Sequence, residues 1–134
     1  MRVLPDTNVI VSAVATRGLG ADVFRAVLSA HELVTCAQVI QEVRRILRIK
    51  FRVPEPLIEE YLELLGQEAI VAKPGDLPDL PLRDRDDAAI VAAAIAAGAE
   101  VLVTGDRELQ SLKNVGKVRI LSPRAFWEEL TAQE

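Results

Sequence analysis

The fold of the chain is best predicted from one stretch near its start, Arg2-Val3-Leu4-Pro5-Asp6-Thr7-Asn8-Val9-Ile10-Val11-Ser12. A short apolar run that ends in Asp-Thr-Asn and then becomes apolar again predicts a buried strand, a tight polar turn and the start of a helix. Asp6 then lies at the carboxyl end of a strand, the edge where ligands bind in open α/β sheets. The alternative is that Asp6 or Asn8 only caps the helix, since Asp and Asn are favoured N-caps. Acids at equivalent places elsewhere would favour the first interpretation.

Length and composition predict one globular domain over residues 1–134. Half of the 134 residues are hydrophobic and 27% are charged, a balance typical of a folded domain. No secretory signal precedes the first strand, and the longest apolar run, residues 88–99, is too short to span a bilayer. We therefore expect a cytoplasmic protein that does not associate with membranes.

Charge and cysteine content exclude several classes of protein. The net charge of −4 argues against a general basic nucleic-acid binder, although cations held by converging acids would raise the potential that a phosphate meets. The single cysteine, Cys36, excludes an internal disulfide bond, and one histidine leaves no Cys/His set for zinc. Cys36 is expected to be a small core residue rather than a nucleophile.

Predicted strands and helices alternate along the chain. After the first strand, apolar runs predict strands at residues 33–36, 69–72, 101–103 and 118–121. Helical spacing predicts helices at 9–14, 22–30, 37–51, 57–65 and 107–112, an alanine-rich helix that Gly98 ends, and a last helix after Ser122; residues 16–20 and 73–83 are predicted to be loops. This order predicts an α/β fold, a three-layer α/β/α sandwich of Rossmann type around a mostly parallel sheet of about five strands.

Three further acids are candidates for the edge that carries Asp6. Asp106 follows the strand 101–103 in a polar turn, and Asp87 begins the helix that leads into that strand. Glu42 lies at the margin of the apolar stripe of helix 37–51, where the alternative is a boundary carboxylate that reaches water. Asp84 and Asp86 stay open as alternatives to Asp87, because three acids within four residues cannot all face one site.

The four acids suggest a metal site. Right-handed crossovers put the carboxyl ends of parallel strands at one edge, so Asp6, Glu42, Asp87 and Asp106 are predicted to converge. Bare carboxylates at short range repel one another and take up protons. The arrangement therefore favours hard divalent cations with oxygen ligands, Mg²⁺ or Mn²⁺. Two such ions about 4 Å apart suit the hydrolysis of a phosphodiester bond by water.

These motifs resemble the four acidic motifs of PIN-domain nucleases. The matching segments are Leu-Pro-Asp-Thr-Asn-Val at 4–9, the helix that bears Glu42, Asp-Ala-Ala-Ile-Val-Ala at 87–92 and Val-Thr-Gly-Asp at 103–106. The resemblance covers nearly the whole chain and is closest to the toxin branch of toxin–antitoxin pairs, which includes the VapC-type ribonucleases. It implies a PIN-like fold, a metal-dependent endoribonuclease that acts on RNA, a homodimer, and a small antitoxin protein whose tail occupies the cleft.

The resemblance also implies individual roles. Asp6, Glu42, Asp87 and Asp106 would bind the metal and carry the catalysis, while Asn8 and Thr104 would orient these acids by hydrogen bonds. Asp87 matches the family pattern better than Asp84 or Asp86. Four arginines flank the predicted cleft and could hold RNA phosphates, the alternative being solvated surface residues; they are Arg17, Arg83, Arg85 and Arg107.

One residue departs from the family pattern. The family usually has an apolar residue with a free N–H where this chain has Pro5, and a proline deletes a ladder hydrogen bond unless the chain is already leaving the sheet. The departure puts the local geometry in question, but not the identity of Asp6.

Two other functions agree with part of the pattern. A catalytically silent PIN fold could bind only RNA or a protein, although such a scaffold has no reason to gather four acids. A receiver-type signalling domain has a similar length, but it needs a phospho-accepting Asp after the third strand and a Lys after the last. Here those places hold Lys73-Pro74 and Ser122-Pro123.

Overall fold

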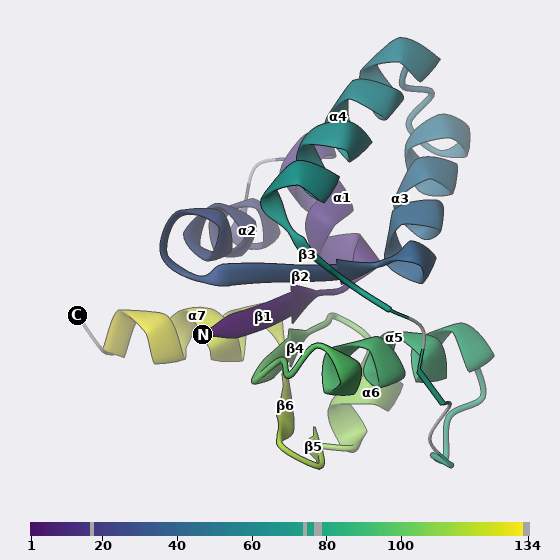
Figure 1. Cartoon of the computed structure of the whole chain (residues 1–134). Helices are drawn as coiled ribbons and strands as arrows, with labels where there is room; N and C mark the ends of the chain where they lie inside the picture. Colours follow the sequence, from purple (N-terminus) through teal and green to yellow (C-terminus); the bar gives the residue numbers. More distant parts are fainter. Residues whose placement is uncertain (17, 74, 77–78, 133–134) are drawn as a thin grey trace.

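The computed structural model describes residues 1–16, 18–73, 75–76, 79–132 and their arrangement around one sheet (Figure 1). The strands are β1 (Arg2–Pro5), β2 (Glu32–Cys36), β3 (Ile70–Ala72), β4 (Val101–Val103), β5 (Asn114–Val115) and β6 (Val118–Leu121). The helices are α1 (Thr7–Ala15), α2 (Leu19–Ala30), α3 (Ala37–Ile49), α4 (Glu55–Glu68), α5 (Arg85–Ala96), α6 (Arg107–Ser111) and α7 (Pro123–Ala132).

The sheet has the order β3-β2-β1-β4-β6-β5, and every pair is parallel except β5 with β6. The chain thus winds outward from β1 to β3, crosses back through α5, and continues from β4 to the opposite edge. Consequently β1 and β4 are neighbours at the centre although about a hundred residues separate Val3 from its partner Val101. Their carboxyl ends, and those of β2 and β3, lie at one edge of the sheet.

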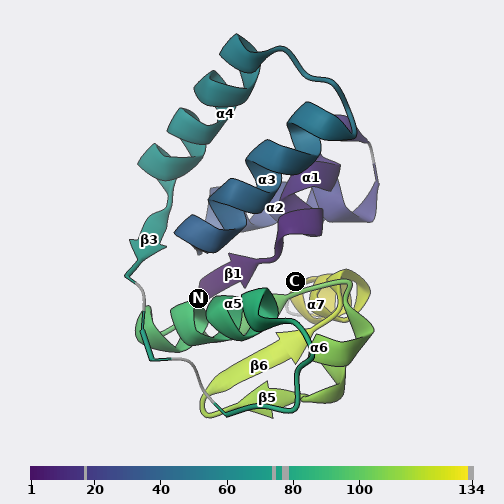
Figure 2. The same ribbon diagram turned by 90° about the vertical axis from the view of Figure 1, so that its right-hand side faces the viewer.

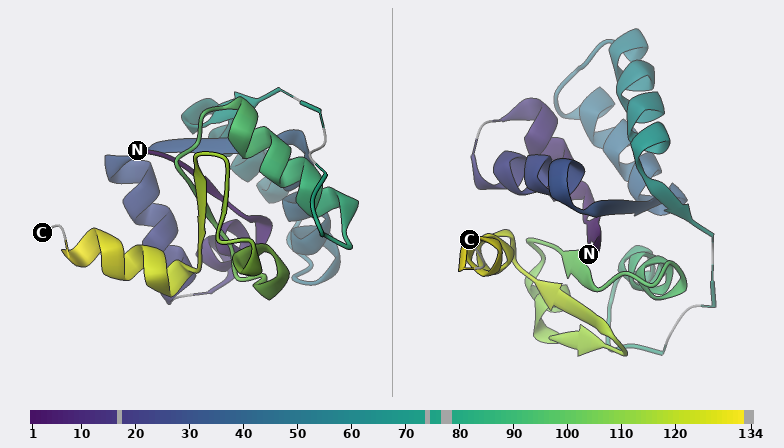
Figure 3. Two further views of the ribbon diagram at one scale, coloured as in Figure 1. Left: turned by 90° about the horizontal axis from the view of Figure 1, so that it is seen from below. Right: turned by 60° about the vertical axis from the view of Figure 1, so that its left-hand side comes forward.

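Helices cover both faces of this sheet, as the predicted three-layer sandwich requires. Seen from below, α2 and α7 lie on one side of β1 and β6, and α5 lies on the other (Figure 3). Apart from the exposed Arg2, the residues of the two central strands β1 and β4 are apolar and buried, as parallel strands covered on both faces should be. The buried alanines of α5, Ala92 to Ala94, let this helix lie close to the sheet, where it contacts β2, β3 and β4.

Pro5 belongs to β1, aligned with Val103 of β4. The next residue donates its N–H to Val103 O at 2.8 Å, so the N–H that Pro5 lacks would point toward β2, because successive N–H groups of a strand alternate in direction. The pairing of β1 with β2 extends only to Val3. The pairing of β1 with β4 thus continues through Pro5, and on the side of β2, where Pro5 has no N–H to donate, the pairing has already ended.

The main differences from the prediction are one additional strand and the bounds of two helices. The described sheet has six strands rather than about five, because β5 is a two-residue strand that turns back through Gly116 at φ 58°, too short for a periodic signal. Helix α2 begins at Leu19, inside the predicted loop. Helix α4 starts at Glu55, with Pro56 in its first turn where proline is tolerated, and continues through Gly66 to Glu68.

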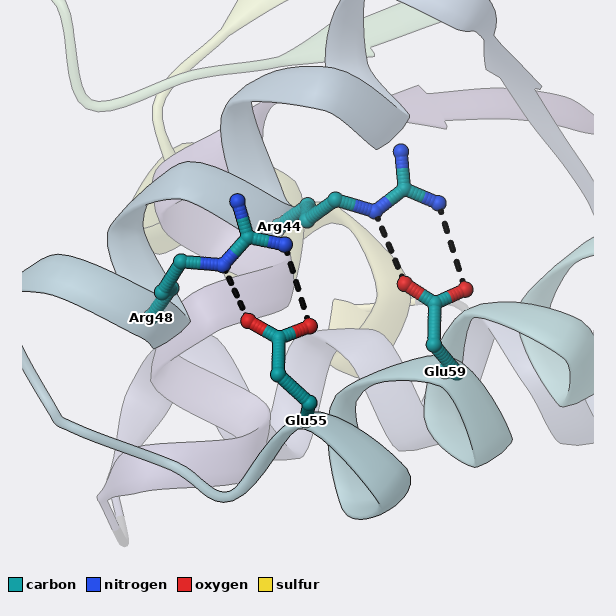
Figure 4. Close-up of polar contacts among 4 residues, drawn as sticks. All are labelled: Arg44, Arg48, Glu55 and Glu59. Atoms are coloured by element: carbon teal, nitrogen blue, oxygen red, sulfur yellow. Dashed lines mark hydrogen bonds and ion pairs between the residues drawn. The ribbon is translucent and has the colours of Figure 1, made fainter.

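Helices α3 and α4 form a hairpin that projects from the sheet (Figure 1, top right). Two ion pairs join them, Arg44 with Glu59 and Arg48 with Glu55, and in each a guanidinium group faces both carboxylate oxygens (Figure 4). These side chains are largely exposed, and such surface pairs contribute little to stability. The buried apolar residues of the two helices belong to the hydrophobic core and anchor the hairpin to it; they are Val39, Val43, Leu47, Ile58, Leu62 and Leu65.

Among the described residues, no helix combines the length and the apolar character that crossing a membrane requires.

Candidate functional site

Asp6 lies at the centre of the candidate site and is 7% exposed. It ends β1 and caps α1, with Oδ1 accepting the Thr7 N–H at 2.7 Å and Oδ2 accepting the Thr104 hydroxyl at 2.7 Å. Burial raises the pKa of Asp6, the two hydrogen bonds oppose this change, and the charges of Glu42 and Asp106 add to it. Asp6 is therefore both a helix cap and a member of an acidic cluster, so the two interpretations of its role do not exclude each other.

Glu42 reaches this centre from α3 through the side chain of Thr7. The Thr7 hydroxyl donates to Glu42 Oε2 at 2.6 Å, while the Thr7 backbone N–H donates to Asp6. One turn earlier in α3, Gln38 Nε2 donates to Glu42 Oε1 at 3.2 Å. Both oxygens of the Glu42 carboxylate thus accept a hydrogen bond, which orients the group toward the end of β1.

Asp106 is joined to Asp6 through Thr104, which is fully buried at the end of β4. The Thr104 hydroxyl donates to Asp6 and accepts the Asp106 N–H at 3.0 Å, and the Thr104 carbonyl accepts from Gln110 Nε2 at 2.7 Å. Asp106 itself caps α6, since its Oδ1 accepts the N–H groups of Glu108 and Leu109. A continuous chain of hydrogen bonds therefore runs from Glu42 through Thr7, Asp6 and Thr104 to Asp106.

Asp87 approaches the same centre from the first turn of α5. Burial, followed by the charges of Asp106, Asp84, Asp6 and Glu42, raises the pKa of Asp87 from 3.8 to about 7. A neighbouring carboxylate raises a pKa in this way only at short range. The carboxylates of four separate segments thus share one electrostatic environment.

The two alternatives to Asp87 are placed differently. Asp84 is the N-cap of α5 and accepts the Asp86 N–H at 2.8 Å, and both Asp84 and Asp86 are exposed. Their positions fit the cap and solvent roles that a helix start with three acids requires.

The other predicted residues are less closely connected to this centre. Asn8 is exposed, and no hydrogen bond joins its side chain to another described residue, so its orienting role stays a prediction. Arg83, Arg85 and Arg107 are exposed beside the starts of α5 and α6. Arg17 lies outside the described residues.

Two residues that hold the acids directly were not among those predicted. Thr7 bridges Asp6 and Glu42, and Gln38 holds the second oxygen of Glu42. Their positions in the sequence gave only a weak indication of these contacts, since Thr7 follows Asp6 directly and Gln38 lies one helical turn before Glu42. Neither is charged, and only the fold brings Thr7 beside α3.

The donor set of this site consists of carboxylates, which suits Mg²⁺ or Mn²⁺ by chemistry. In the described part of the chain, no three acidic, histidine or cysteine side chains are arranged as metal ligands. Asp6 and Asp106 accept hydrogen bonds from N–H groups at the starts of α1 and α6, and Glu42 accepts one from Thr7. Each of these carboxylates keeps further lone pairs that could bind a cation.

Comparisons with known proteins relate this geometry to a family. A model of the PIN domain matches residues 2–108. The fold is similar to two solved structures, VapBC-1 from nontypeable Haemophilus influenzae and VapBC2 from Rickettsia felis bound to a DNA fragment from their promoter. The first has a TM-score of 0.64 and 19% identity, over 92% of this chain and 99% of that one. The second has a TM-score of 0.61 and 14% identity, over 91% and 98%.

No curated protein sequence matches the chain significantly. At these sequence identities the two structures show only that the fold is similar, and the family assignment rests on the PIN domain model. The matched residues include all four acids, and the match excludes the receiver-domain alternative. The chain belongs to the PIN domain family.

Proposed function

We propose that the protein is a metal-dependent endoribonuclease that hydrolyses phosphodiester bonds of RNA at the cluster of Asp6, Glu42, Asp87 and Asp106. One observation carries the proposal: hydrogen bonds through Thr7 and Thr104 link Glu42, Asp6 and Asp106 at one sheet edge. Burial, and then the charges of Asp106, Asp84, Asp6 and Glu42, raise the pKa of Asp87 beside them to about 7. Bringing negative charges together costs free energy because they repel one another. A bound divalent cation would offset this repulsion, whereas a scaffold without catalytic activity would have no need of the four acids.

The four carboxylates would hold Mg²⁺ or Mn²⁺, which when bound polarises a phosphoryl oxygen and lowers the pKa of a water molecule. The surrounding residues keep the acids in place. Thr7 and Thr104 hold Asp6 through both of its oxygens, and Thr7 with Gln38 holds Glu42. Arg85 and Arg107, at the starts of α5 and α6, are suited to binding the phosphates of the substrate.

The test is cleavage of single-stranded RNA by the wild type and by Asp6→Asn. We expect cleavage with Mg²⁺ or Mn²⁺, none with chelator, and a loss of about a hundredfold or more in the variant. Asp76→Asn is the matched control, because Asp76 is exposed in the loop before α5. Cleavage that persists both with chelator and in Asp6→Asn would refute the mechanism.

We further propose that a small antitoxin protein inhibits this nuclease and that the protein acts as a homodimer. The toxin branch that the motifs resemble supports both points, and the fold similarity to VapBC-1 and VapBC2 supports the antitoxin partner. Co-expression with the product of an adjacent small reading frame should yield a complex without ribonuclease activity. Light scattering should give twice the 14.6 kDa of one chain. A monomer at micromolar concentration would contradict the dimer.

A further inference from the structure

A cavity of about 190 Å³ lies next to the acidic cluster, where β2 and β3 end. It is enclosed by the first turns of α3, the end of β3 and one face of α5, and Figure 2 shows the beginning of α3 near both β3 and α5. The residues that line it include Gln38, Gln41, Ala72, Lys73, Ala89 and Ala93. We call it the α3 pocket.

The α3 pocket shares a side chain with the acidic cluster. Gln38, which lines the pocket, donates its amide hydrogen to Glu42 Oε1 at 3.2 Å. The strand β2, which ends at the pocket, pairs with β1, which ends at Asp6. A group bound in the pocket would therefore lie one strand away from the bond that the acids are proposed to cleave.

The lining favours a flat, neutral, hydrogen-bonding group. The methyl groups of four alanines, Ala37 among them, offer an apolar surface, and the amides of Gln38 and Gln41 each carry both a donor and an acceptor. A nucleobase has the same division between apolar faces and a polar edge, and proteins that read single-stranded RNA bind unstacked bases by their faces and edges. A phosphate is disfavoured, since Lys73 is the single cation of the lining and Glu42 is adjacent.

We propose that the α3 pocket binds one nucleobase of the RNA strand beside the scissile phosphate, and that Gln41 and Gln38 select this base by hydrogen bonds to its edge. The inference rests on the proposed ribonuclease function. Lys73, exposed at the rim, contacts the backbone phosphate next to the bound base. Gln38 has a second role as a positioning residue, because it also holds Glu42.

The experiment measures base preference on a pool of random single-stranded RNA whose cut ends are sequenced. We expect the wild type to favour certain bases at one position flanking the cut. Gln41→Ala should reduce that preference by about tenfold, the effect of losing hydrogen bonds to a base edge. Lys73→Ala should weaken cleavage of all sequences alike. The control is Gln67→Ala, since Gln67 is exposed on α4 and does not line the pocket.

A second measurement does not depend on cleavage. The wild type and Gln41→Ala are titrated with each of the four nucleoside 5′-monophosphates in chelator, and the side-chain amide signals of Gln38 and Gln41 are followed by NMR. We expect at least one nucleotide to shift these signals in the wild type and to bind Gln41→Ala about tenfold more weakly.

The outcomes separate this proposal from the proposed function. If the wild type cleaves RNA and Gln41→Ala keeps the full base preference, the pocket assignment is wrong and the nuclease assignment stands. If the wild type cleaves nothing but a nucleotide shifts the two amides, the pocket assignment stands without the nuclease. If no nucleotide shifts them and no preference exists, the pocket does not bind a base.

Discussion

Thr7 has no charge, yet it connects two of the four acids. Its backbone N–H and its hydroxyl point in different directions, so a single residue orients Asp6 at 2.7 Å and Glu42 at 2.6 Å. The residue is 3% exposed, so water cannot replace the hydroxyl. At this scale the site depends as much on the neutral groups that direct the carboxylates as on the carboxylates themselves.

Thr7→Val should lower ribonuclease activity by about tenfold, because the shape is kept while one hydrogen bond to Glu42 is lost. Thr7→Ser retains the hydroxyl and should restore most of the activity. The measurement is kcat/KM on a short RNA with Mg²⁺. Equal activity of the valine and wild-type proteins would show that Thr7 does not orient Glu42.

Asp87 makes the stability of the metal-free protein depend on pH. Its pKa is about 7 in the folded chain and 3.8 in the reference state, so between these values the folded protein holds a proton that the unfolded chain has lost. The free energy of unfolding should therefore fall as pH rises from about 4 to about 7 and change little above that. The raised pKa of Asp6 acts in the same direction.

Asp87→Asn should reduce this pH dependence and raise stability at pH 8 by about 1 kcal/mol, less than the full shift implies because solvent screens a partly exposed group. Urea unfolding in chelator between pH 5 and 8 provides the measurement. Asp76→Asn serves as the exposed control. A wild type whose stability increases from pH 5 to 8 would contradict the carboxylate cluster.

At the scale of elements, three of the four acids lie at the start of a helix. Asp6 and Asp106 are the N-caps of α1 and α6, and they follow the strands β1 and β4 directly or within three residues. Asp87 lies in the first turn of α5. Negative charge at helix starts is stabilised by the helix dipole, which offsets part of the repulsion among the acids.

The packing of α1 against α2 depends on a glycine. A Cβ atom at Gly20 would lie 2.9 Å from Ser12 Cβ, closer than two carbon atoms can approach without a shift. Gly20→Ala should therefore lower the free energy of unfolding by about 1–3 kcal/mol. Because α1 begins at the candidate site, the same shift should also lower activity.

Gly66 provides the matched control for this substitution. It lies inside α4, and a methyl group at this position would have no neighbouring atom within 4 Å, so Gly66→Ala should raise stability by up to about 1 kcal/mol through helix propensity. Urea unfolding of both variants provides the comparison. If both changes are equally harmless, the close contact between α1 and α2 does not exist.

At the scale of the whole molecule, the sheet order creates the site. The crossover from β3 through α5 to β4 places β4 beside β1, so that Thr104 hydrogen-bonds to Asp6 across 98 positions of sequence. The same winding brings β2 and β3 to the other side of β1, where their ends form the α3 pocket. The acidic cluster and the pocket are thus two parts of one sheet edge.

The central strands should therefore dominate global stability. Leu102 of β4 is fully buried, and Leu102→Ala should cost about 2–5 kcal/mol. Leu64 of α4 is 53% exposed, and Leu64→Ala should change stability by only about 0.5 kcal/mol. Urea unfolding measures both, and similar losses would mean that the core is not centred on β1 and β4.

The local sequence was sufficient to predict most of the helices and strands and the α/β class of the fold. Alternating apolar runs and helical periods predicted the mostly parallel sheet flanked by helices, because burial on both faces leaves a pattern that each segment shows by itself. The ends of β1 and β4 could be predicted for the same reason, since Asp6 and Asp106 interrupt apolar runs. Strand β5 and the start of α2 were missed because two residues, or a turn beginning at glycine, carry no period.

The tertiary structure alone decided which groups meet. That Thr7 joins Asp6 to Glu42, and that Gln38 is shared by the acidic cluster and a pocket, follow from the order and register of the strands. The resemblance implied an orienting role for Thr104, and the pairing of β1 with β4 places its hydroxyl 2.7 Å from Asp6 Oδ2. A periodic pattern records whether a residue is buried but not which distant residue it contacts. Contacts between segments depend on how strands pair across the whole chain, and that pairing is a property of the folded core rather than of any one segment.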